Sequence, residues 1–379
     1  MSSAPESIRR SLRPTIAEIS LGSFRRNVET IRSRLPARSR LIPVIKADAY
    51  GHGAVPIARE CERLGIHMLA VALVEEAIEL REAGIRADLF VSGPLSVEEI
   101  EVCVERGFHV GISTIDSLED LRGILTPTGR TAHIHLKVDS GMGRLGLLED
   151  ELGHAASLLS SMPEARIEAI YTHFASSSNP DDPFTDSQIR WFRRMVEQLR
   201  RDGVEAPIEH SASSAAVMRG LVDAGDYVRV GLSIYGGEPL ERGDSRLEPV
   251  LRWTTRVTRM RHLPVGHCVG YGCTYTTIRP STIVQLPVGY ADGFNRLLSN
   301  NGDVLIRGRR ASVIGTISMD IVTVDVTDIP DVAPGDEVVL IGRQGDEWIT
   351  AEEIAARIGT ISYEILTRIG QRVPRIWTD

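Results

Sequence analysis

The sequence predicts an α/β fold made of a (β/α)8 TIM-like barrel followed by a mainly-β C-terminal domain. Over the first two thirds of the 379 residues, short apolar runs alternate with amphipathic helical stretches. Eight such runs favour a closed barrel of parallel strands over an open sheet. After about Leu240 the sequence changes to short β-segments separated by Gly and Asp turns. We therefore expect the barrel over 14–240 and the second domain over 241–379, with a linker at 236–247.

The runs assigned to barrel strands are short and bounded by turn signals, as expected for buried parallel strands. Helical periodicity between them is clearest over 74–83 and 187–202. A possible strand over 14–19 and a helix over 22–34 precede the first run. The eight barrel runs span 41–45, 68–73, 88–92, 108–112, 132–138, 166–174, 207–211 and 226–232.

The second domain is predicted to be built mainly from strands. Only 351–358 and 361–369 have a helical pattern in this part of the chain. Gly and Asp residues between the β-rich segments supply the turns. These segments span 250–259, 281–289, 303–307, 311–317, 320–326 and 337–342.

Charge and composition exclude several classes of function. The net charge of −8 (43 basic against 51 acidic residues) argues against nucleic-acid partners and anionic membrane surfaces. No apolar run reaches the length of a transmembrane helix, and the first 14 residues lack the apolar core of a secretory signal. The four cysteines have neither metal-binding nor redox spacing, so we expect reduced thiols in a cytoplasmic protein. They are Cys61, Cys103, Cys268 and Cys273.

The most informative motif is VIKADAYGHG at residues 44–53. Its lysine, Lys46, follows an apolar run and precedes a Gly-rich turn, so it lies at the carboxyl end of a predicted strand, where α/β folds place their chemistry. Desolvation at such a position lowers the pKa of a lysine, and the neutral amine is the nucleophile that Schiff-base chemistry needs. From position alone, a structural lysine that extends its amine to solvent remains the alternative.

The whole string resembles the pyridoxal-phosphate attachment motif of the alanine racemases, and the resemblance continues in separate blocks from about Ile16 to about Trp377. It implies that Lys46 binds pyridoxal 5'-phosphate as a Schiff base and serves as one of two catalytic bases. Tyr271, in VGYGCTY, matches the second base. Because the reference pKa of tyrosine is about 10, such a base needs a neighbouring cation. The resemblance also implies that the strand over 14–19 packs with the C-terminal domain.

Further blocks match positions that hold the cofactor. Arg229, in YVRVGLSIYGG, matches the donor to the pyridine nitrogen, and the backbone amides of Gly231 and Leu232 match the phosphate cradle. An arginine does not give up its proton, so that nitrogen is expected to stay unprotonated. Val230 stands where the family usually has proline, and Ser213 where it commonly has asparagine. The resemblance also assigns cofactor contacts to Tyr50, His173, Ser214 and Tyr363.

The segment TAHIHLKVDSGMGRLG (131–146) carries a His-x-His pair on a predicted strand. His133 and His135 share one strand face with Lys137 and Asp139. The pair raises a metal-dependent barrel hydrolase as an alternative, but no further ligand follows at suitable spacing, so no metal is expected.

The resemblance gives this segment a different role. It implies that Lys137 is often carbamylated and positions Arg144, which contacts the substrate carboxylate or the catalytic tyrosine. In the C-terminal domain, Met319 matches a substrate-binding position, and Tyr290 and Asp320 match supporting positions at the substrate entry. Thr316 stands where the family often has arginine.

The resemblance implies a cytoplasmic isomerase that interconverts L- and D-alanine and supplies D-alanine for the peptidoglycan of the cell wall. Because Lys46 and Tyr271 lie in different domains, it also implies a head-to-tail homodimer with shared active sites. A racemase for another small amino acid such as serine remains open, since one hydroxyl in a small pocket is weakly discriminated. Two further hypotheses are a decarboxylase of the same fold and a non-catalytic cofactor-binding barrel. The decarboxylases lack the block that contains Tyr271. The non-catalytic family consists of a barrel only, so the large β domain predicted here argues against that hypothesis.

Overall fold

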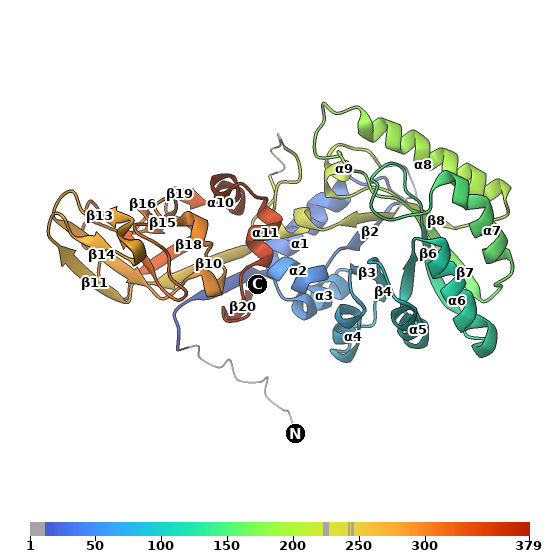
Figure 1. The fold of residues 1–379 in the computed structure, drawn as a ribbon, viewed down its shortest axis with the longest axis horizontal. Coiled ribbons are helices and arrows are strands. Elements are labelled where there is room, and N and C mark those ends of the chain that lie inside the picture. The colour runs from blue at the N-terminus through green and yellow to red at the C-terminus, as the bar shows by residue number, and fades with distance from the viewer. Residues whose placement is uncertain (1–11, 223–226, 242, 244–245) are drawn as a thin grey trace, which may run out of the picture. The chain divides into compact units, whose positions relative to one another are not determined.

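The computed structural model describes residues 12–222, 227–241, 243 and 246–379 of the chain (Figure 1). These residues form two compact units. One unit comprises Ser23–Glu248, and the other comprises the described residues up to Gly22 together with Pro249–Asp379.

The larger unit contains a barrel of parallel strands. Strands β3 to β8 pair in sequence order, and β2 pairs with β9. A bridge between Val44 and Ala70 connects β2 to β3, and the amide of Arg229 donates to Ala212 O at 3.0 Å beside β8. The strands are β2 (Arg40–Pro43), β3 (Met68–Val71), β4 (Asp88–Val91), β5 (His109–Ile112), β6 (Ala132–Lys137), β7 (Ala165–Tyr171), β8 (Ile208–His210) and β9 (Tyr227–Val230). The predicted fold class is thus confirmed; residue 226, the first of the last predicted run, lies outside the described residues.

Helices alternate with these strands, and α4, α5 and α6 follow one another along the outside of the sheet (Figure 1). Several begin and end at residues suited to capping. Ser96 accepts a hydrogen bond from the amide of Glu99 at the start of α5, and Gly107 ends that helix in the left-handed conformation. The helices are α1 (Leu21–Ser33), α2 (Lys46–Gly51), α3 (Ala54–Arg63), α4 (Val74–Glu82), α5 (Val97–Arg106), α6 (Ile115–Thr128), α7 (Leu152–Ser160), α8 (Phe184–Arg201) and α9 (Ser214–Met218). None of the described helices is long and apolar enough to cross a bilayer.

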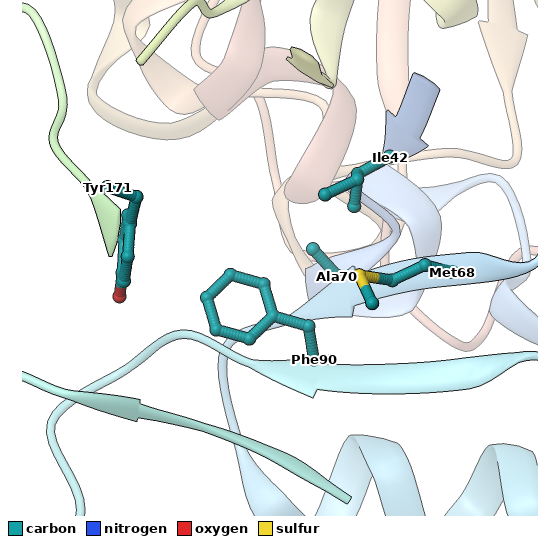
Figure 2. Packing of buried hydrophobic residues seen from close by; sticks show 5 residues of the cluster. All are labelled: Ile42, Met68, Ala70, Phe90 and Tyr171. Atoms are coloured by element: carbon teal, nitrogen blue, oxygen red, sulfur yellow. The ribbon is translucent and has the colours of Figure 1, made fainter. Parts of the chain in front are cut away.

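The barrel interior is filled by side chains from several strands. Figure 2 shows one apolar cluster within it, in which Phe90 lies between Tyr171 on one side and Ile42, Met68 and Ala70 on the other. All of these side chains are buried. The interior is therefore a packed core, and the polar groups described below are set into it.

The second unit is mainly β. Strand β1 (Ile16–Ser20) joins it, pairing antiparallel with β10 (Leu251–Arg256) and parallel with β20 (Arg375–Thr378). The main sheet has the order β16-β15-β18-β10-β1-β20, with β19 paired to β18, and β11-β14-β17 and β12-β13 form two smaller sheets. The remaining elements are β11 (Arg259–Leu263), β12 (Cys268–Val269), β13 (Tyr275–Thr276), β14 (Ser281–Leu286), β15 (Asp303–Ile306), β16 (Arg309–Ser312), β17 (Val322–Asp325), β18 (Glu337–Gln344), β19 (Glu347–Ile349), α10 (Ala351–Ile358) and α11 (Ser362–Thr367).

The cysteine prediction is wrong for two of the four residues. Cys268 and Cys273 form a disulfide with their Cα atoms 5.2 Å apart, because the β12–β13 hairpin folds one back beside the other. Cys61 and Cys103 are free thiols buried in the barrel unit, and burial raises the pKa of both. Because two of the four cysteines are paired, the cysteines do not support the expected location in a reducing compartment.

Candidate active site

Lys46 follows the carboxyl end of β2, where the chain leaves the barrel wall. The amides of Val44 and Ile45 donate to Val230 O and Ala70 O, both at 2.8 Å, and this fixes the chain between its neighbours. Residues 47–50 then form a left-handed turn with φ between 51° and 56°. Each non-glycine residue in this conformation costs on the order of 1 kcal/mol, so the turn persists only if surrounding contacts hold it.

Those contacts are present. The carboxylate of Glu76 accepts a hydrogen bond from the amide of Ala47 at 2.5 Å, and that of Asp48 accepts one from Ala54 at 2.7 Å. The turn carries Tyr50 inward, where it is buried and its ring stacks on Tyr235 with centroids 5.0 Å apart. The strained turn therefore places Lys46 and Tyr50 together at the end of β2.

The environment of Lys46 lowers the pKa of its amine. Its side chain is exposed in the single chain, yet its amine is sufficiently desolvated for its pKa to be lowered, and the charge of Arg144 lowers it further. The carboxylate of Glu76 acts in the opposite direction but does not offset them. A lysine with a lowered pKa is available as a nucleophile toward a carbonyl.

Arg229, on β9, is buried and bonded to acceptors. Its Nη1 donates to Nδ1 of His210 at 2.5 Å and to His210 O at 2.8 Å. Its Nη2 donates to Thr172 O at 2.6 Å and to Nδ1 of His173 at 3.2 Å. Within the described residues its Nε donates to no acceptor, so one N–H of a buried guanidinium remains for a group that enters the barrel. Burial lowers the pKa of Arg229 to about 10, which still leaves it charged near neutral pH.

Gly231 and Ser214 form an anion cradle at the carboxyl end of β9. The hydroxyl of Ser214, at the start of α9, accepts from the amides of Gly231 at 3.2 Å and Ser233 at 3.5 Å. A Cβ at Gly231 would collide with the hydroxyl of Tyr50, so only glycine leaves that space open. Leu232, the next residue, is buried. Two hydroxyls and convergent amides suit a phosphate.

Lys137 and His173 lie near Arg229, and the pKa of each is lowered. Burial, followed by the charges of Arg229 and Arg144, lowers the pKa of Lys137 to about 8. Burial and Arg229 lower the pKa of His173 to about 3, in keeping with its Nδ1 accepting from the guanidinium. No carboxylate among the described residues lies within salt-bridge distance of Lys137, whose amine sits 5.5 Å from the ring centre of Tyr171.

The loop that carries Arg144 is organised by Asp139. Its carboxylate accepts from the amides of residues 141, 142 and 143 at 2.7–2.8 Å. Asp139 therefore caps the loop rather than pairing with Lys137, the last residue of β6. Arg144 is exposed, and its charge reaches Lys46, Lys137 and His173.

The His-x-His pair separates into two different contacts. His133 bonds to Glu168 at 2.7 Å, whereas His135 lies between two further buried histidines, His109 and His210. No group of three or more side chains suited to a metal ion occurs in the part of the chain that the structure describes. No sequence pattern singles out His109 or His210, because their partners come from other strands.

Tyr271 lies in the second unit, on a tight turn between β12 and β13. The turn is closed by the Cys268–Cys273 disulfide, and Gly270, Gly272 and Cys273 all have φ between 49° and 75°. The Oγ1 of Thr316 donates to the carbonyl of Tyr271 at 2.9 Å. The tyrosine side chain is 75% exposed in the single chain.

The other predicted residues of this unit are also at its surface. The amides of Tyr290 and Ala291 donate to Ser318 O and Met319 O at 3.2 and 3.1 Å, so Tyr290 and Met319 come together. Asp320 pairs with Arg372 at 2.7 Å, and Tyr363 is on α11 with its pKa raised by burial. Sequence reasoning missed Asp292, which is fully buried and anchors the 289–293 turn through Arg13 at 2.6 Å. The sequence feature that could have indicated Asp292 is a carboxylate between two glycines, in the segment GYADG at 289–293.

Two family models cover nearly the whole chain. The alanine racemase N-terminal domain matches residues 19–239, and the alanine racemase C-terminal domain matches residues 250–377.

The chain belongs to the alanine racemase family.

Members of this family with similar sequences and structures cover 96–97% of the chain. The alanine racemase of Symbiobacterium thermophilum is 42% identical over 368 residues, 97% of each chain. The solved alanine racemase of Clostridium difficile 630 superposes with a TM-score of 0.91 at 34% identity, covering 97% of each chain. That of Bartonella henselae, solved with covalently bound pyridoxal phosphate, has a TM-score of 0.88 at 28% identity and covers 96% of this chain and 99% of its own. The family resemblance expected from the motifs is confirmed.

Proposed function

We propose that this member of the alanine racemase family works with two bases, Lys46 on one face of the substrate Cα and Tyr271 on the other, and with pyridoxal 5'-phosphate held in the barrel. The activity itself, interconversion of L- and D-alanine, follows from membership of the family over both domains. The proposal concerns which residues of this chain carry it. The observation that supports it best is the convergence of Lys46, Arg229 and the anion cradle on the carboxyl ends of neighbouring strands β2 and β9.

The barrel residues fit the cofactor. Lys46 offers an amine with a lowered pKa, Ser214 and the amides around Gly231 suit the phosphate, and Tyr50 adds a hydroxyl beside Gly231. The Nε of Arg229 offers a donor to the ring nitrogen, and His173 lies beside this guanidinium. When bound, pyridoxal phosphate stabilises negative charge at the substrate Cα. Because Arg229 would donate without releasing its proton, a ring nitrogen bonded to it would stay unprotonated and this stabilisation would be moderate.

The residues of the chain divide the proton transfers between them. Lys46 takes or returns the proton on the D face, and Tyr271 does so on the L face. Tyr271 needs a nearby cation to act as a base, and Arg144 is the candidate in the barrel unit. A carbamate on Lys137 would hold that arginine in place, since a lysine with a pKa of about 8 has a reactive amine fraction near neutral pH. In this proposal Met319 binds the substrate and Tyr363 contacts the cofactor. Tyr290 and Asp320 support the substrate entry.

We further propose that two subunits share each site. Lys46 and Tyr271 belong to different compact units, and Tyr271, Tyr290, Met319 and Tyr363 all keep large exposed surfaces in the single chain. Tyr290 and Met319 come together on this surface, and adjoining exposed apolar side chains are typical of interaction surfaces. We also propose that the enzyme is cytoplasmic and that it supplies D-alanine for the cell wall.

Reductive trapping tests the assignment of Lys46. Borohydride treatment of the yellow holoenzyme should fix the cofactor to a single peptide within residues 41–56. The treated enzyme should lose racemisation of both alanine enantiomers, and parallel assays with L- and D-serine would measure the preference for alanine. Lys137→Ala, which removes the other barrel lysine with a lowered pKa, is the matched control and should still label at Lys46. Label on any other peptide would show that Lys46 is not the residue that binds the cofactor.

A further inference from the structure

Three buried histidines continue from Arg229 through the barrel interior. Nε2 of His210, on β8, lies 2.9 Å from Nδ1 of His135 on β6. Nε2 of His135 lies 3.0 Å from Nδ1 of His109 on β5. With the 2.5 Å contact from Arg229 to Nδ1 of His210, these groups form an unbroken row of hydrogen bonds across the barrel, here called the histidine row.

The direction of every hydrogen bond in this row is fixed by its first member. A guanidinium only donates, and a neutral imidazole has one donor and one acceptor nitrogen. Nδ1 of His210 must therefore accept from Arg229, which places the proton of His210 on Nε2. That N–H donates to Nδ1 of His135, whose own proton is then on Nε2 and donates to Nδ1 of His109. All three residues are predicted to be Nε2–H tautomers.

The surroundings keep the row neutral and rigid. Burial first, and then the charge of Arg229, lowers the pKa of His210 far below its usual value; burial and the charge of His109 do the same for the pKa of His135. Phe90 stacks on His135 at 4.2 Å and Tyr171 stacks on His210 at 4.7 Å. Figure 2 shows these two aromatic rings within the apolar core cluster. Water is thus displaced from the sides of the row, and each imidazole depends on the next for its hydrogen bond.

We propose that His210, His135 and His109 are positioning residues for racemisation, which hold Arg229 as a fixed donor to the ring nitrogen of the cofactor. The proposal rests on the proposed role of Arg229. His210 presents an acceptor to Arg229 only while its Nε2–H has a partner, and His135 provides that partner. His109 does the same for His135. Without this sequence of acceptors, His210 could place its proton on Nδ1, facing the guanidinium, and Arg229 would lose its alignment.

The tautomers can be measured directly. Nitrogen-15 NMR of the holoenzyme with labelled histidine distinguishes a protonated from an unprotonated ring nitrogen, and His→Gln variants assign the signals. His210, His135 and His109 should each show Nε2–H and an unprotonated Nδ1. An Nδ1–H tautomer or an imidazolium at any of the three overturns the row. This measurement does not depend on catalytic activity.

A pair of variants tests the role in the reaction. His135→Leu removes the acceptor for His210 and should lower kcat about tenfold, the order expected when one buried donor is left unpaired, with KM changed less than about twofold. Nδ1–H should appear at His210, and transamination should rise relative to racemisation. His135→Gln, whose amide both accepts and donates, should restore most of kcat.

His133→Gln is the matched control, because His133 is on the same strand and stacks on His109 at 5.1 Å, but its hydrogen bond goes to Glu168, outside the row. It should leave the tautomers and the ratio of side reaction to racemisation unchanged. If His135→Leu folds and racemises as the native enzyme does, the positioning role is wrong even if the tautomers are as stated. The role of Arg229 itself is decided separately by Arg229→Glu, so failure of the two proposals can be told apart.

Discussion

Thr316 donates a hydrogen bond from its hydroxyl to the backbone carbonyl of Tyr271 at 2.9 Å. The same hydroxyl lies 3.1 Å from Oγ1 of Thr274, and a backbone bridge joins Thr316 to Gly270. Thr316 therefore holds both sides of the turn that carries the proposed base, at a position where the family often has arginine. The contact gives this departure from the family pattern a structural role.

Removing the hydroxyl of Thr316 should loosen the tyrosine turn. A neutral hydrogen bond contributes about 1 kcal/mol, so Thr316→Val should lower kcat for L-alanine about fivefold. Thr316→Ser keeps the hydroxyl and should stay within about twofold of the native enzyme. Steady-state kinetics of both variants, with thermal unfolding to exclude a global loss of stability, would measure this. Equal kinetics for Val and Ser at this position would show that the hydroxyl does not hold Tyr271.

Arg229→Glu tests the proposed contact with the ring nitrogen. A carboxylate at this position can accept a hydrogen bond from a protonated ring nitrogen, which arginine cannot. The cofactor would then withdraw electrons more strongly, so transamination should rise relative to racemisation and a new absorbance should persist during turnover. Arg229→Lys keeps a donor-only cation and serves as the control. An Arg229→Glu enzyme with the native spectrum and native product ratio would contradict the contact.

Lys137 should react with carbon dioxide more readily than an ordinary lysine. Carbamate formation joins the neutral amine to CO2 and releases one proton. With a pKa of about 8, roughly a tenth of the amine is neutral at pH 7, against less than about 0.1% for an exposed lysine. Carbamylation should therefore increase as the pH rises from 7 to 9. Carbon-13 NMR after exchange with labelled bicarbonate would detect it.

The control for this measurement is Lys137→Arg, which keeps a charge but cannot form the carbamate. Its spectrum should lack the signal while Lys46 still binds the cofactor. High-resolution density with a bare amine at Lys137, at pH 8 and in the presence of bicarbonate, would count against the modification.

The sequence was sufficient for those parts of the fold and site that are local in the chain. The eight barrel runs, the helices at 74–83 and 187–202 and the VIKADAYGHG motif each depend on neighbouring residues, and periodicity or a motif captures them. Strands β12, β13, β19 and β20 were missed because they are two to four residues long and, unlike the equally short barrel strands, do not lie within an apolar run. Strand β11, RMRHL, was missed because it carries two arginines and is mostly exposed.

The features that sequence analysis could not supply depend on contacts across strands. His109, His135 and His210 come from β5, β6 and β8, and only the folded barrel brings their rings together. The register of β5 and β6 places His133, and not His135, opposite His109. Asp139 was expected to share a face with Lys137, but the chain turns after β6 and the carboxylate caps a loop. The disulfide likewise depends on the β12–β13 hairpin, which the spacing of Cys268 and Cys273 does not reveal.

A mixed dimer tests whether two subunits share each active site. Lys46→Ala and Tyr271→Phe homodimers should each lose nearly all activity, because every site lacks one base. In a mixed dimer, one site combines the intact lysine of one subunit with the intact tyrosine of its partner, and the other site carries both lesions. Half of the sites are then complete, so co-expression with two affinity tags should yield a species with about half the native kcat per dimer.

Two controls make the mixed-dimer result decisive. A dimer of one native and one doubly substituted subunit has one lesion in each shared site and should be nearly inactive. If each chain forms its own site, the outcome reverses: the native subunit stays active in that second dimer, while the first mixed dimer remains as inactive as its parents. Sedimentation and cofactor absorbance must show both species to be dimeric and loaded. The two architectures therefore predict opposite results from the same pair of samples.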